Sequence, residues 1–477
     1  MKNILCAAVL SSLPSVDEVS VDAALRRELS ADPTRFIVLD DDPTGTQTVH
    51  GVTVFTDWSV DSLRAGLLEK NKLFFVLTNS RGLTEAETAD VHRQIAANAA
   101  SAARETGVPY LFISRSDSTL RGHYPLETEL LRRGLEADGR PVDGEILCFF
   151  FREGGRFTLN NIHYVRNGEE LVPAAQTEFA RDATFGYSHS DLPGYIEEKT
   201  DGVYPASGVT CISLDELRHC DYAGIQAKLE RVNDFGKVVV NAADYCDVKV
   251  FAVALFRSMA SGKRFLFRSA AGLVKVLGGI GDRPLLRRSE MIRRVPDRGG
   301  VVVVGSHTAK TTAQLENLLT LPDTVPIPFR SSLVLQGDEA LTAEVDRCVA
   351  LEKAAVRAGQ TAVCFTERVL LALPGDTKET ALLRSVKISS AVQQLVGRLD
   401  TEPSFVIAKG GITSSTIGTD ALRVKRATVL GQICPGVTVW QTDSGSKFPG
   451  IPYVIFPGNV GDAETLRRAV EILTGRD

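Results

Sequence analysis

The sequence predicts a two-domain α/β protein whose largely parallel sheets are covered by helices. Three observations lead to this fold class. The chain has 477 residues, which is too many for one ordinary hydrophobic core. Short apolar runs alternate with amphipathic stretches, a pattern typical of parallel sheets with crossover helices. A stretch rich in Gly, Arg and Pro at 278–300 interrupts the pattern, so we place a boundary near residue 285, between domains of 1–285 and 286–477.

The apolar and amphipathic stretches give the expected elements of each domain. In the first domain, strands are expected at 36–39, 73–77, 110–113 and 238–240, and helices at 17–29 and 86–105. In the second domain, strands are expected at 301–304, 362–365, 405–408, 438–440 and 453–456, and helices at 310–319 and 376–399. The section 151–210 is rich in Gly, aromatic and polar residues and is expected to form long functional loops.

Composition excludes several classes of function. The net charge of −5 offers no general attraction to nucleic acid or to an anionic membrane, and no apolar run is long enough to span a bilayer. Eight scattered cysteines without a Cys-x-x-Cys pair favour reduced thiols and therefore a soluble cytoplasmic protein. Residues 1–13 also resemble a short signal peptide, but the helical pattern that follows favours an extension packed on the domain.

Acidic residues follow the first strong strand. The run 36–39 leads into Asp40-Asp41-Asp42-Pro43-Thr44-Gly45, at the carboxyl end of a strand, where open α/β sheets bind their ligands. Three adjacent carboxylates are costly to bury without a cation or polar partners. We interpret one of them as a proton acceptor or a ligand for substrate hydroxyls, with Mg²⁺ nearby; the alternative is a solvated turn before a helix.

The next two strands also end in polar clusters, which contain Arg81 and Arg121. Each arginine has a planar fork suited to a carboxylate, while neighbouring carboxylates and hydroxyls suit the hydroxyls of a ligand. A small polyhydroxy acid fits these residues, although either arginine alone could form an ordinary surface ion pair. The segment 153–156 is either a loop over the same edge or an ordinary turn, and His123 and His163 are expected to be structural. The other candidates in these clusters are Ser116, Asp117, Ser118 and Thr119.

The second domain has no Walker A motif and no complete Gly-x-Gly-x-x-Gly after a strand. Instead, the strand 301–304 is followed by Gly305-Ser306, and the strand 405–408 by Lys409-Gly410-Gly411-Ile412-Thr413. Glycine permits close approach of the backbone, and free amides at the start of a helix attract an anion. Residues 444–450 and 457–461 are further glycine-rich turns for a nucleotide cleft, and Lys409 and Lys447 are either phosphate ligands or surface charges.

Together these motifs resemble the four-carbon acid sugar kinase family, from about residue 35 to 472. The resemblance implies an N-terminal domain that binds the sugar acid, a C-terminal domain that binds ATP, and an active site in the cleft between them. It rests on Asp41 to Gly45, Thr78 to Arg81, Ser116 to Gly122, Gly305-Ser306, Gly410 to Thr413 and Phe448-Pro449-Gly450. It implies substrate contacts by Asp42, Arg81 and Ser116 to Thr119, and ATP contacts by Ser306, Gly410, Gly411, Ile412, Thr413 and Gly450. Pro43, the N-terminal extension and an enlarged middle section depart from the family pattern and leave the acceptor open.

The expected reaction is phosphoryl transfer from ATP, with Mg²⁺, to a hydroxyl of the acid. This chemistry needs positioning, charge stabilisation and a nearby carboxylate base. Asp42 is the expected base and Asp117 the second candidate, while Arg81 and Arg121 would hold the substrate carboxylate. The metal ligands are not identified, and a homodimer is left open.

Two other interpretations remain at this point. Asp40 to Thr44 also fits the Asp-x-Asp-x-Thr motif of a haloacid-dehalogenase-type phosphatase, with Asp40 as the nucleophile, although the late acidic pair of that family is missing. The chain could instead be a non-enzymatic metabolite-binding protein, which would bind both ligands without turning over ATP.

Overall fold

The computed structural model describes residues 3–292, 298–369, 371, 373–374 and 376–476, and divides the chain into two compact units. Unit 1 comprises residues 1–48 and 57–281, and unit 2 comprises residues 49–56 and 282–477. Both combine sheets of mostly parallel strands with covering helices, which confirms the predicted two-domain α/β fold. The short segment 49–56 belongs to unit 2, although the sequence analysis placed it in the first domain.

A parallel sheet forms the centre of unit 1. Its strand order is β10 (Thr210–Ile212), β11 (Gly236–Val240), β6 (Gly144–Cys148), β12 (Phe265–Ser269), β5 (Tyr110–Arg115), β2 (Arg35–Asp40) and β4 (Leu73–Leu77). The strands read as apolar runs and are almost entirely buried, because helices cover both faces of a parallel sheet.

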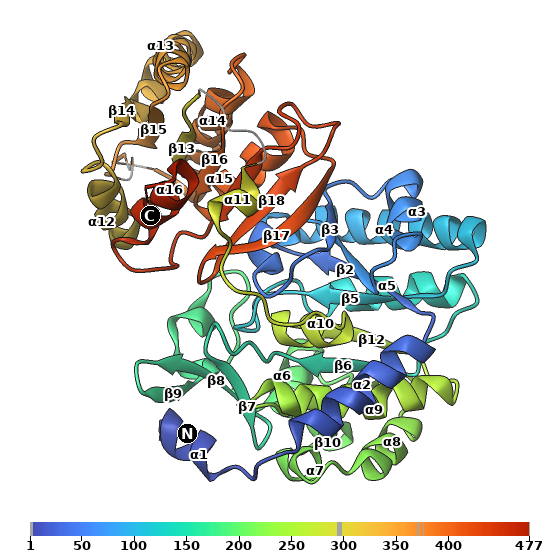
Figure 1. The fold of residues 1–477 in the computed structure, drawn as a ribbon. Coiled ribbons are helices and arrows are strands. Elements are labelled where there is room, and N and C mark those ends of the chain that lie inside the picture. The colour runs from blue at the N-terminus through green and yellow to red at the C-terminus, as the bar shows by residue number, and fades with distance from the viewer. Residues whose placement is uncertain (1–2, 293–297, 370, 372, 375, 477) are drawn as a thin grey trace. The chain divides into compact units, whose positions relative to one another are not determined.

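The helices of unit 1 follow from right-handed crossovers between these strands. Helices α4 (Glu85–Thr106) and α5 (Leu126–Ala137) connect strands in one direction across the sheet and lie together on one face with α3 (Val60–Leu67). Helix α9 (Tyr245–Ala260) connects β11 to β12 in the opposite direction and therefore covers the other face (Figure 1). It contacts the helices α2 (Glu18–Ala31), α7 (Leu214–Arg218), α8 (Tyr222–Glu230) and α10 (Ala271–Leu277).

The expectation of long loops at 151–210 is wrong. An antiparallel sheet occupies much of this section, in the order β1 (Ile4–Leu5), β9 (Glu170–Pro173), β8 (Ile162–Asn167) and β7 (Arg156–Leu159). The helix α6 (Leu192–Lys199) follows, and its side chains Leu192, Tyr195 and Ile196 join a buried cluster with Leu120 and Phe149. The strands are short, so their alternating apolar residues indicated strand less clearly than the surrounding glycines indicated loop. The extension before α2 contains β1 and α1 (Cys6–Ser12).

Unit 2 has a sheet with a parallel part and an antiparallel part. The parallel part runs β19 (Pro452–Phe456), β16 (Val406–Lys409), β13 (Val301–Val304), β15 (Thr361–Thr366) and β14 (Thr324–Phe329). The antiparallel part continues from β19 through β18 (Val437–Thr442) and β17 (Arg426–Cys434) to β3 (Thr53–Phe55). Thus β3, from the excursion at 49–56, is hydrogen-bonded to β17.

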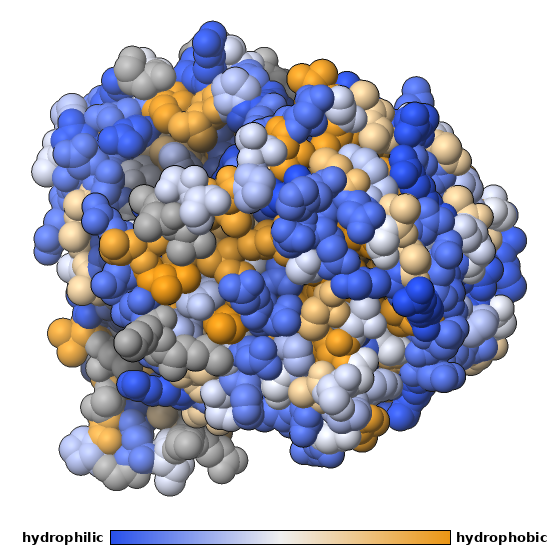
Figure 2. All heavy atoms as spheres, turned by 90° about the horizontal axis from the view of Figure 1, so that it is seen from below, coloured by the Kyte–Doolittle hydropathy of each residue, from blue (hydrophilic) through white to orange (hydrophobic). Residues whose placement is uncertain are grey.

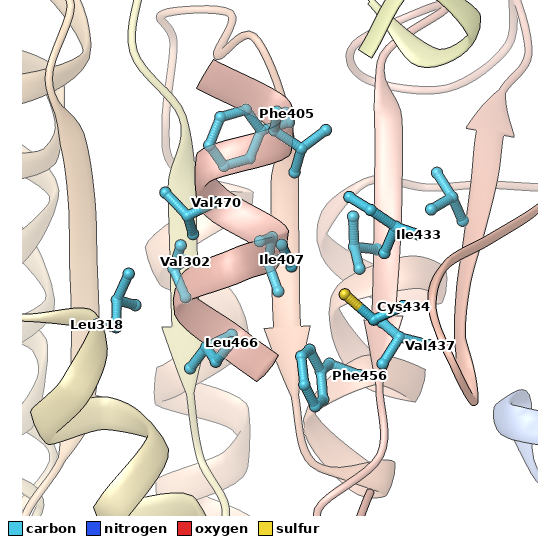
Figure 3. Close-up of a cluster of buried hydrophobic side chains, with 14 of the residues drawn as sticks. Val302, Leu318, Phe405, Ile407, Ile433, Cys434, Val437, Phe456, Leu466 and Val470 are labelled. Atoms are coloured by element: carbon cyan, nitrogen blue, oxygen red, sulfur yellow. The ribbon is translucent and has the colours of Figure 1, made fainter. Parts of the chain in front are cut away.

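Helices cover both faces of the unit 2 sheet. Helices α13 (Asp338–Arg357) and α14 (Lys378–Gly397) contact each other, and α12 (Ala309–Leu318) contacts α16 (Thr465–Thr474). Figure 3 shows Leu466 and Val470 of α16 packed against Val302, Ile407 and Phe456 of the sheet. The expected linker at 278–300 contains the short helix α11 (Arg288–Met291), and residues 293–297 lie outside the described part. The helix α15 (Gly411–Thr416) follows β16.

Hydrophilic residues predominate on the face seen in Figure 2, with groups of hydrophobic residues between them. Across the described ranges, no helix is both long enough and apolar enough to cross a membrane.

A glutamate without an ionic partner is buried between α13 and β15. Oε1 of Glu352 accepts a hydrogen bond from Sγ of Cys364 at 2.8 Å, and Oε2 has no hydrogen-bond partner. Burial raises the pKa of Glu352 to about 8, against the opposing effect of the Cys364 hydrogen bond. The side chain is therefore a neutral acid near pH 7, because an isolated buried carboxylate is strongly unfavourable.

We expect the free energy of unfolding to depend on pH through Glu352. The folded pKa of about 8 lies above the ordinary value of 4.5, so the stabilising contribution is complete below the ordinary value and is lost as pH rises through about 8. Glu352→Gln removes this titration. Denaturant unfolding from about pH 5 to about pH 9 should show the variant gaining stability relative to wild type until about pH 8.

Glu344 on the same helix provides the control. Burial opposes its ionisation, but hydrogen bonds from Arg347 and Arg330 outweigh this effect and lower its pKa to about 2. Both its folded and unfolded forms are ionised in most of the pH range tested, so Glu344→Gln should differ from wild type by a nearly constant amount. A similarly constant difference for Glu352→Gln would show that Glu352 is ionised in the folded protein.

Candidate functional site

The turns after β2, β4 and β5 lie next to one another at the carboxyl edge of the unit 1 sheet. Parallel pairing sets Asp40 of β2 opposite Leu77 of β4 and opposite Arg115 of β5. The chain therefore leaves all three strands at the same edge, which is where open α/β sheets bind ligands. The three polar clusters that the sequence analysis selected are thus brought together.

Asp40 is a buried structural residue of this edge. Its carboxylate is 2% exposed and accepts a hydrogen bond from Arg115 Nη1 at 3.1 Å. A side chain at Gly45 would place its Cβ 2.0 Å from the Asp40 carboxylate oxygens, so the turn closes over the carboxylate only with glycine there. Burial raises the pKa of Asp40 to about 7, with Arg115 opposing the shift.

Arg81 forms a two-pronged ion pair with Asp41. Its Nε donates to Asp41 Oδ2 at 3.1 Å and its Nη2 to Asp41 Oδ1 at 2.5 Å. Burial raises the pKa of Asp41, and Arg81 opposes this shift. The sequence analysis expected this fork to hold the substrate carboxylate, whereas the structure shows the fork occupied by a protein carboxylate. A substrate contact by Arg81 would require that the pair opens or that the outer Nη1 is used.

Asp42 has the most accessible carboxylate of the aspartates in these turns. Its Oδ1 accepts a hydrogen bond from the Thr44 amide at 2.8 Å, which caps the short helix at Pro43–Thr46. Its Oδ2 has only a 3.4 Å contact with Arg81 Nη1. The Asp42 side chain is 22% exposed, compared with 12% for Asp117. One oxygen of Asp42 is therefore held by the backbone, while the other is available to a ligand.

Asp117 is held by residues of its own loop. Arg121 Nε donates to Asp117 Oδ2 at 2.6 Å, and the Thr119 hydroxyl donates to the same oxygen. Burial opposes ionisation, but Arg81, Arg121 and these hydrogen bonds outweigh it and lower the pKa of Asp117 to about 2. Arg121 also contacts Asp182 at 3.4 Å. Asp117 is therefore ionised but a weak proton acceptor, and both expected carboxylate-binding arginines are paired with aspartates.

The serines of this loop have mainly internal roles. The Ser116 hydroxyl is fully buried and has no hydrogen-bond partner, and Ser118 is nearly buried. His163 bridges two segments: its Nε2 lies 2.8 Å from the Ser118 carbonyl, and its Nδ1 lies 3.1 Å from the Thr158 hydroxyl. Burial lowers the pKa of His163 to about 4. This histidine is structural and ties the loop to the antiparallel sheet; His123 similarly lies 2.9 Å from a backbone carbonyl.

A buried network that the sequence analysis missed lies beneath the edge. Arg268 of β12 pairs with Glu127 of α5 and donates to the Ser114 hydroxyl at 3.0 Å. Ser80 donates to Glu127 Oε1 at 2.7 Å. Burial opposes ionisation of Glu127, but Arg268 and His92 outweigh it and lower the pKa of Glu127 to about 2. The signal in the sequence was Arg268, directly after the apolar run 265–267, since a charge in a buried strand needs a partner.

Three turns converge at the carboxyl edge of the unit 2 sheet, after β13, β16 and β19. A Cβ on Gly305 would lie 2.1 Å from the Thr413 hydroxyl, and one on Gly410 would lie 3.3 Å from Cβ of Ser306. A Cβ on Gly458 would lie 3.0 Å from the Ser306 hydroxyl. The backbones approach this closely because glycines occupy these positions. The predicted Ser306 and Gly410–Thr413 turns are therefore neighbours.

Hydrogen bonds hold these turns together. The Thr311 hydroxyl donates to the Ser306 hydroxyl at 3.0 Å and lies 3.1 Å from the Gly458 carbonyl. Lys409 Nζ donates to the Pro457 carbonyl at 2.7 Å and lies over the Phe456 ring. Burial lowers the pKa of Lys409 to about 7. Lys409 is fully buried, so it is not a surface charge, and its hydrogen bond to Pro457 holds the turn after β19.

Gly411 and Ile412 begin α15, directly after β16. Ile412 is 74% exposed, an unusual position for an isoleucine. Its side chain is therefore accessible at the edge where the three glycine turns converge.

Gly450 and Lys447 lie away from these turns. β16 and β19 are parallel, with Val406 opposite Tyr453. Gly450 precedes β19, whereas Gly410 follows β16, so the two glycines lie at opposite ends of neighbouring parallel strands. A strand of this length spans about 16 Å, at about 3.3 Å per residue. Lys447 Nζ donates to the Val396 and Gly397 carbonyls at the end of α14. The sequence analysis chose Gly450 for the ATP site, but the structure brings Gly458 beside Ser306 instead.

No group of three or more His, Cys, Asp or Glu side chains in the described residues is arranged to hold a metal ion. A Mg²⁺ ion that arrives with a nucleotide does not need such a group, because phosphate oxygens and water supply most of its ligands.

Comparisons with known proteins assign the two parts of the chain to two kinds of domain. A family model described as a sugar-binding N-terminal domain matches residues 36–277, and one described as a nucleotide-binding C-terminal domain matches residues 301–466. No curated protein matches the chain.

Two solved structures show the same fold over almost the whole chain. A Salmonella typhimurium LT2 protein, provisionally described as a tRNA synthase, is 15% identical with a TM-score of 0.65, and the match covers 92% of this chain and 99% of that one. A Haemophilus influenzae protein of the DUF1537 family is 16% identical with a TM-score of 0.59, over 92% of this chain and 100% of that one. By the two domain models, the chain belongs to the family that joins a sugar-binding N-terminal domain to a nucleotide-binding C-terminal domain, the four-carbon acid sugar kinase family.

Proposed function

We propose that the protein is an ATP-dependent kinase that transfers the γ-phosphate to a hydroxyl of a small, four-carbon sugar acid. The observation that carries this proposal is the state of Asp42. Among the aspartates in the turns after β2 and β5, it combines the greatest exposure with one oxygen whose contact to Arg81 Nη1 is long, at 3.4 Å. A carboxylate at the sugar-binding edge that is fixed by one oxygen and available through the other suits a general base.

In this reaction, the acceptor hydroxyl gives its proton to Asp42 as its oxygen bonds to the γ-phosphorus. The bond from that phosphorus to the bridging oxygen of ATP breaks, and ADP leaves. Asp117 is the second candidate for the base, although its pKa of about 2 makes it a weak proton acceptor. Its ionised oxygens, with the Ser118 and Thr119 loop, are proposed to orient the substrate hydroxyls.

The turns after β13, β16 and β19 are proposed to bind the phosphates of ATP. The amides of Gly305, Ser306 and Gly410 already bond to backbone carbonyls. The phosphates would therefore meet the first amides of α15 and the Ser306 hydroxyl. Mg²⁺ would neutralise the phosphates on which charge develops. The exposed Ile412 would provide an apolar contact for the nucleotide. A cytoplasmic location, a homodimeric state and a catalytic cleft between the domains remain predictions.

The buried state of Asp40 argues against the phosphatase alternative. A nucleophile must reach a phosphorus atom, but the Asp40 carboxylate is packed against Gly45 and paired with Arg115. The metabolite-binding alternative shares both binding sites with the kinase and differs only in the absence of turnover.

The experiment that tests the proposed function is an ADP-release assay with ATP, Mg²⁺ and a panel of four-carbon sugar acids, including threonate and erythronate. We expect ADP release only when a suitable acid is present, because phosphoryl transfer requires a bound acceptor hydroxyl. Release of inorganic phosphate from sugar phosphates without ATP would support the phosphatase instead. Tight binding of acid and ATP without turnover would support the binding protein.

We expect Asp42→Asn to lower kcat by about 100-fold or more, because asparagine retains the size of aspartate but cannot accept the proton. The KM for the acid should change less than kcat, and steady-state kinetics with the best acid provides the measurement. Asp40→Asn is the comparison. It should lower stability, since it weakens the pair with Arg115, yet leave substantial activity; complete loss of activity in a folded Asp40→Asn protein would favour Asp40 as a nucleophile.

We expect Gly458→Val to weaken ATP binding by about ten-fold or more, because a branched side chain would enter the space beside the Ser306 hydroxyl. Gly450→Asn is the matched control: Gly450 has a φ of +77° with open space at its Cβ, and asparagine tolerates this conformation. Titration with ATP should give near-wild-type affinity for this control. The reverse ranking would restore Gly450 to the nucleotide site and remove Gly458 from it.

A further inference from the structure

The arginines of the unit 1 edge differ in whether a protein carboxylate neutralises them. Arg115 is paired with Asp40, Arg81 with Asp41, and Arg121 with Asp117. None of these arginines has its guanidinium fully available, because each already makes at least one charged hydrogen bond. A substrate carboxylate held by one of them would compete with a protein aspartate.

Arg156, the first residue of β7, is the exception. Among the described residues it has no carboxylate partner, and its Nη1 donates to the backbone carbonyl of Gly154. Its Nε is buried without a partner. Burial lowers the pKa of Arg156, and nearby Asp117 opposes that shift. An unpaired, half-buried guanidinium is thus held close to the Asp117 loop, where an anion would offset the cost of its burial.

Arg156 is adjacent to the predicted substrate residues. Its guanidinium carbon lies 5.7 Å from the centre of the Phe179 ring, and that of Arg121 lies 5.0 Å from the same centre. The Phe179 ring therefore makes cation–π contacts with both guanidinium groups. Repulsion from Arg121 contributes to the lowered pKa of Arg156, which is further evidence that the two charges are near each other. A carboxylate that reached both would relieve this repulsion.

The backbone fixes Arg156 relative to the Asp117 loop. Arg156 and Phe151 exchange two backbone hydrogen bonds, of 2.8 and 3.1 Å, across a tight turn. The same strand β7 carries Thr158, which contacts His163, and His163 contacts the Ser118 carbonyl. The antiparallel sheet therefore fixes the backbone from which the Arg156 side chain extends.

We propose that Arg156 binds the carboxylate of the sugar acid, with Arg121 beside it, and so determines the preference for an acid over a neutral polyol. This inference rests on the proposed acceptor site in unit 1. It assigns the carboxylate contact mainly to Arg156, whereas the sequence analysis assigned it to Arg81 and Arg121. The chemical requirement is a carboxylate at one end of the ligand and hydroxyls that reach the Asp42 and Asp117 region.

The test compares Arg156→Met with Arg152→Met in the full-length protein. Methionine keeps an unbranched apolar chain against the aromatic ring but removes the charge. Arg152 is a suitable control because it lies in the same turn and over the Tyr245 ring, but it is paired with exposed Asp244. Calorimetric titration with erythronate, threonate and the neutral polyol erythritol measures acceptor binding without nucleotide, and a separate ATP titration measures nucleotide binding.

We expect Arg156→Met to weaken binding of the acid by about 10- to 100-fold, as for loss of a charge-assisted contact. Arg152→Met should bind the acid like wild type, and neither variant should change ATP binding. Binding of erythritol should be equally weak in all three proteins. Arg156→Lys, which retains charge but not the fork, should give an intermediate affinity. Thermal unfolding of each variant checks that the fold is intact; if Arg156→Met does not fold, Arg156→Lys decides the outcome.

Unchanged acid affinity in a folded Arg156→Met or Arg156→Lys protein would overturn the inference, as would a loss of ATP affinity with retained acid affinity. If wild type binds an acid but releases no ADP with ATP present, the kinase proposal fails while the titrations still decide the role of Arg156. If wild type binds none of the acids, both the proposed acceptor class and this inference fail.

Discussion

The carboxylates at the end of the unit 1 strands impose the constraint around which that site is built. Taking a carboxylate out of water is unfavourable unless a cation or hydrogen-bond donors compensate for lost solvation. The arginine for Asp40 comes from β5, and the arginine for Asp41 comes from the turn after β4. These pairs join three neighbouring strand ends. The same compensation leaves Asp42 and Arg156 as the charged groups with the most capacity for an external ligand.

The sequence was informative where one physical requirement determined the pattern. Runs such as 301–304 had to be buried strands, and polar residues directly after them had to emerge at the carboxyl edge once the sheet was parallel. The α/β fold and the convergence of the turns containing Asp42, Arg81 and Asp117 were predictable for this reason. Likewise, glycine and serine after β13 and β16 pointed to closely packed turns.

Pairing partners and sheet edges were less predictable, because they depend on residues that are distant in the sequence. Arg81 had the right chemistry for a substrate carboxylate, but sequence alone could not reveal that Asp41 occupies its fork. Gly450 and Gly458 lie in similar glycine-rich turns, and only the direction of β19 shows which one lies beside Ser306. The section after 151 looked like loops because its strands are short, although those strands position Arg156.

The excursion through β3 has a consequence for the modularity of the chain. Unit 2 takes the segment 49–56 from between two parts of unit 1, and β3 pairs along the edge of β17. A gene fragment that encodes only 282–477 would omit this strand and leave the β17 backbone with unpaired donors and acceptors, which favour edge-to-edge aggregation. The two units therefore do not correspond to two continuous segments of the chain. Recombination that exchanges a C-terminal half between relatives must also preserve a compatible eight-residue insert near the N-terminus.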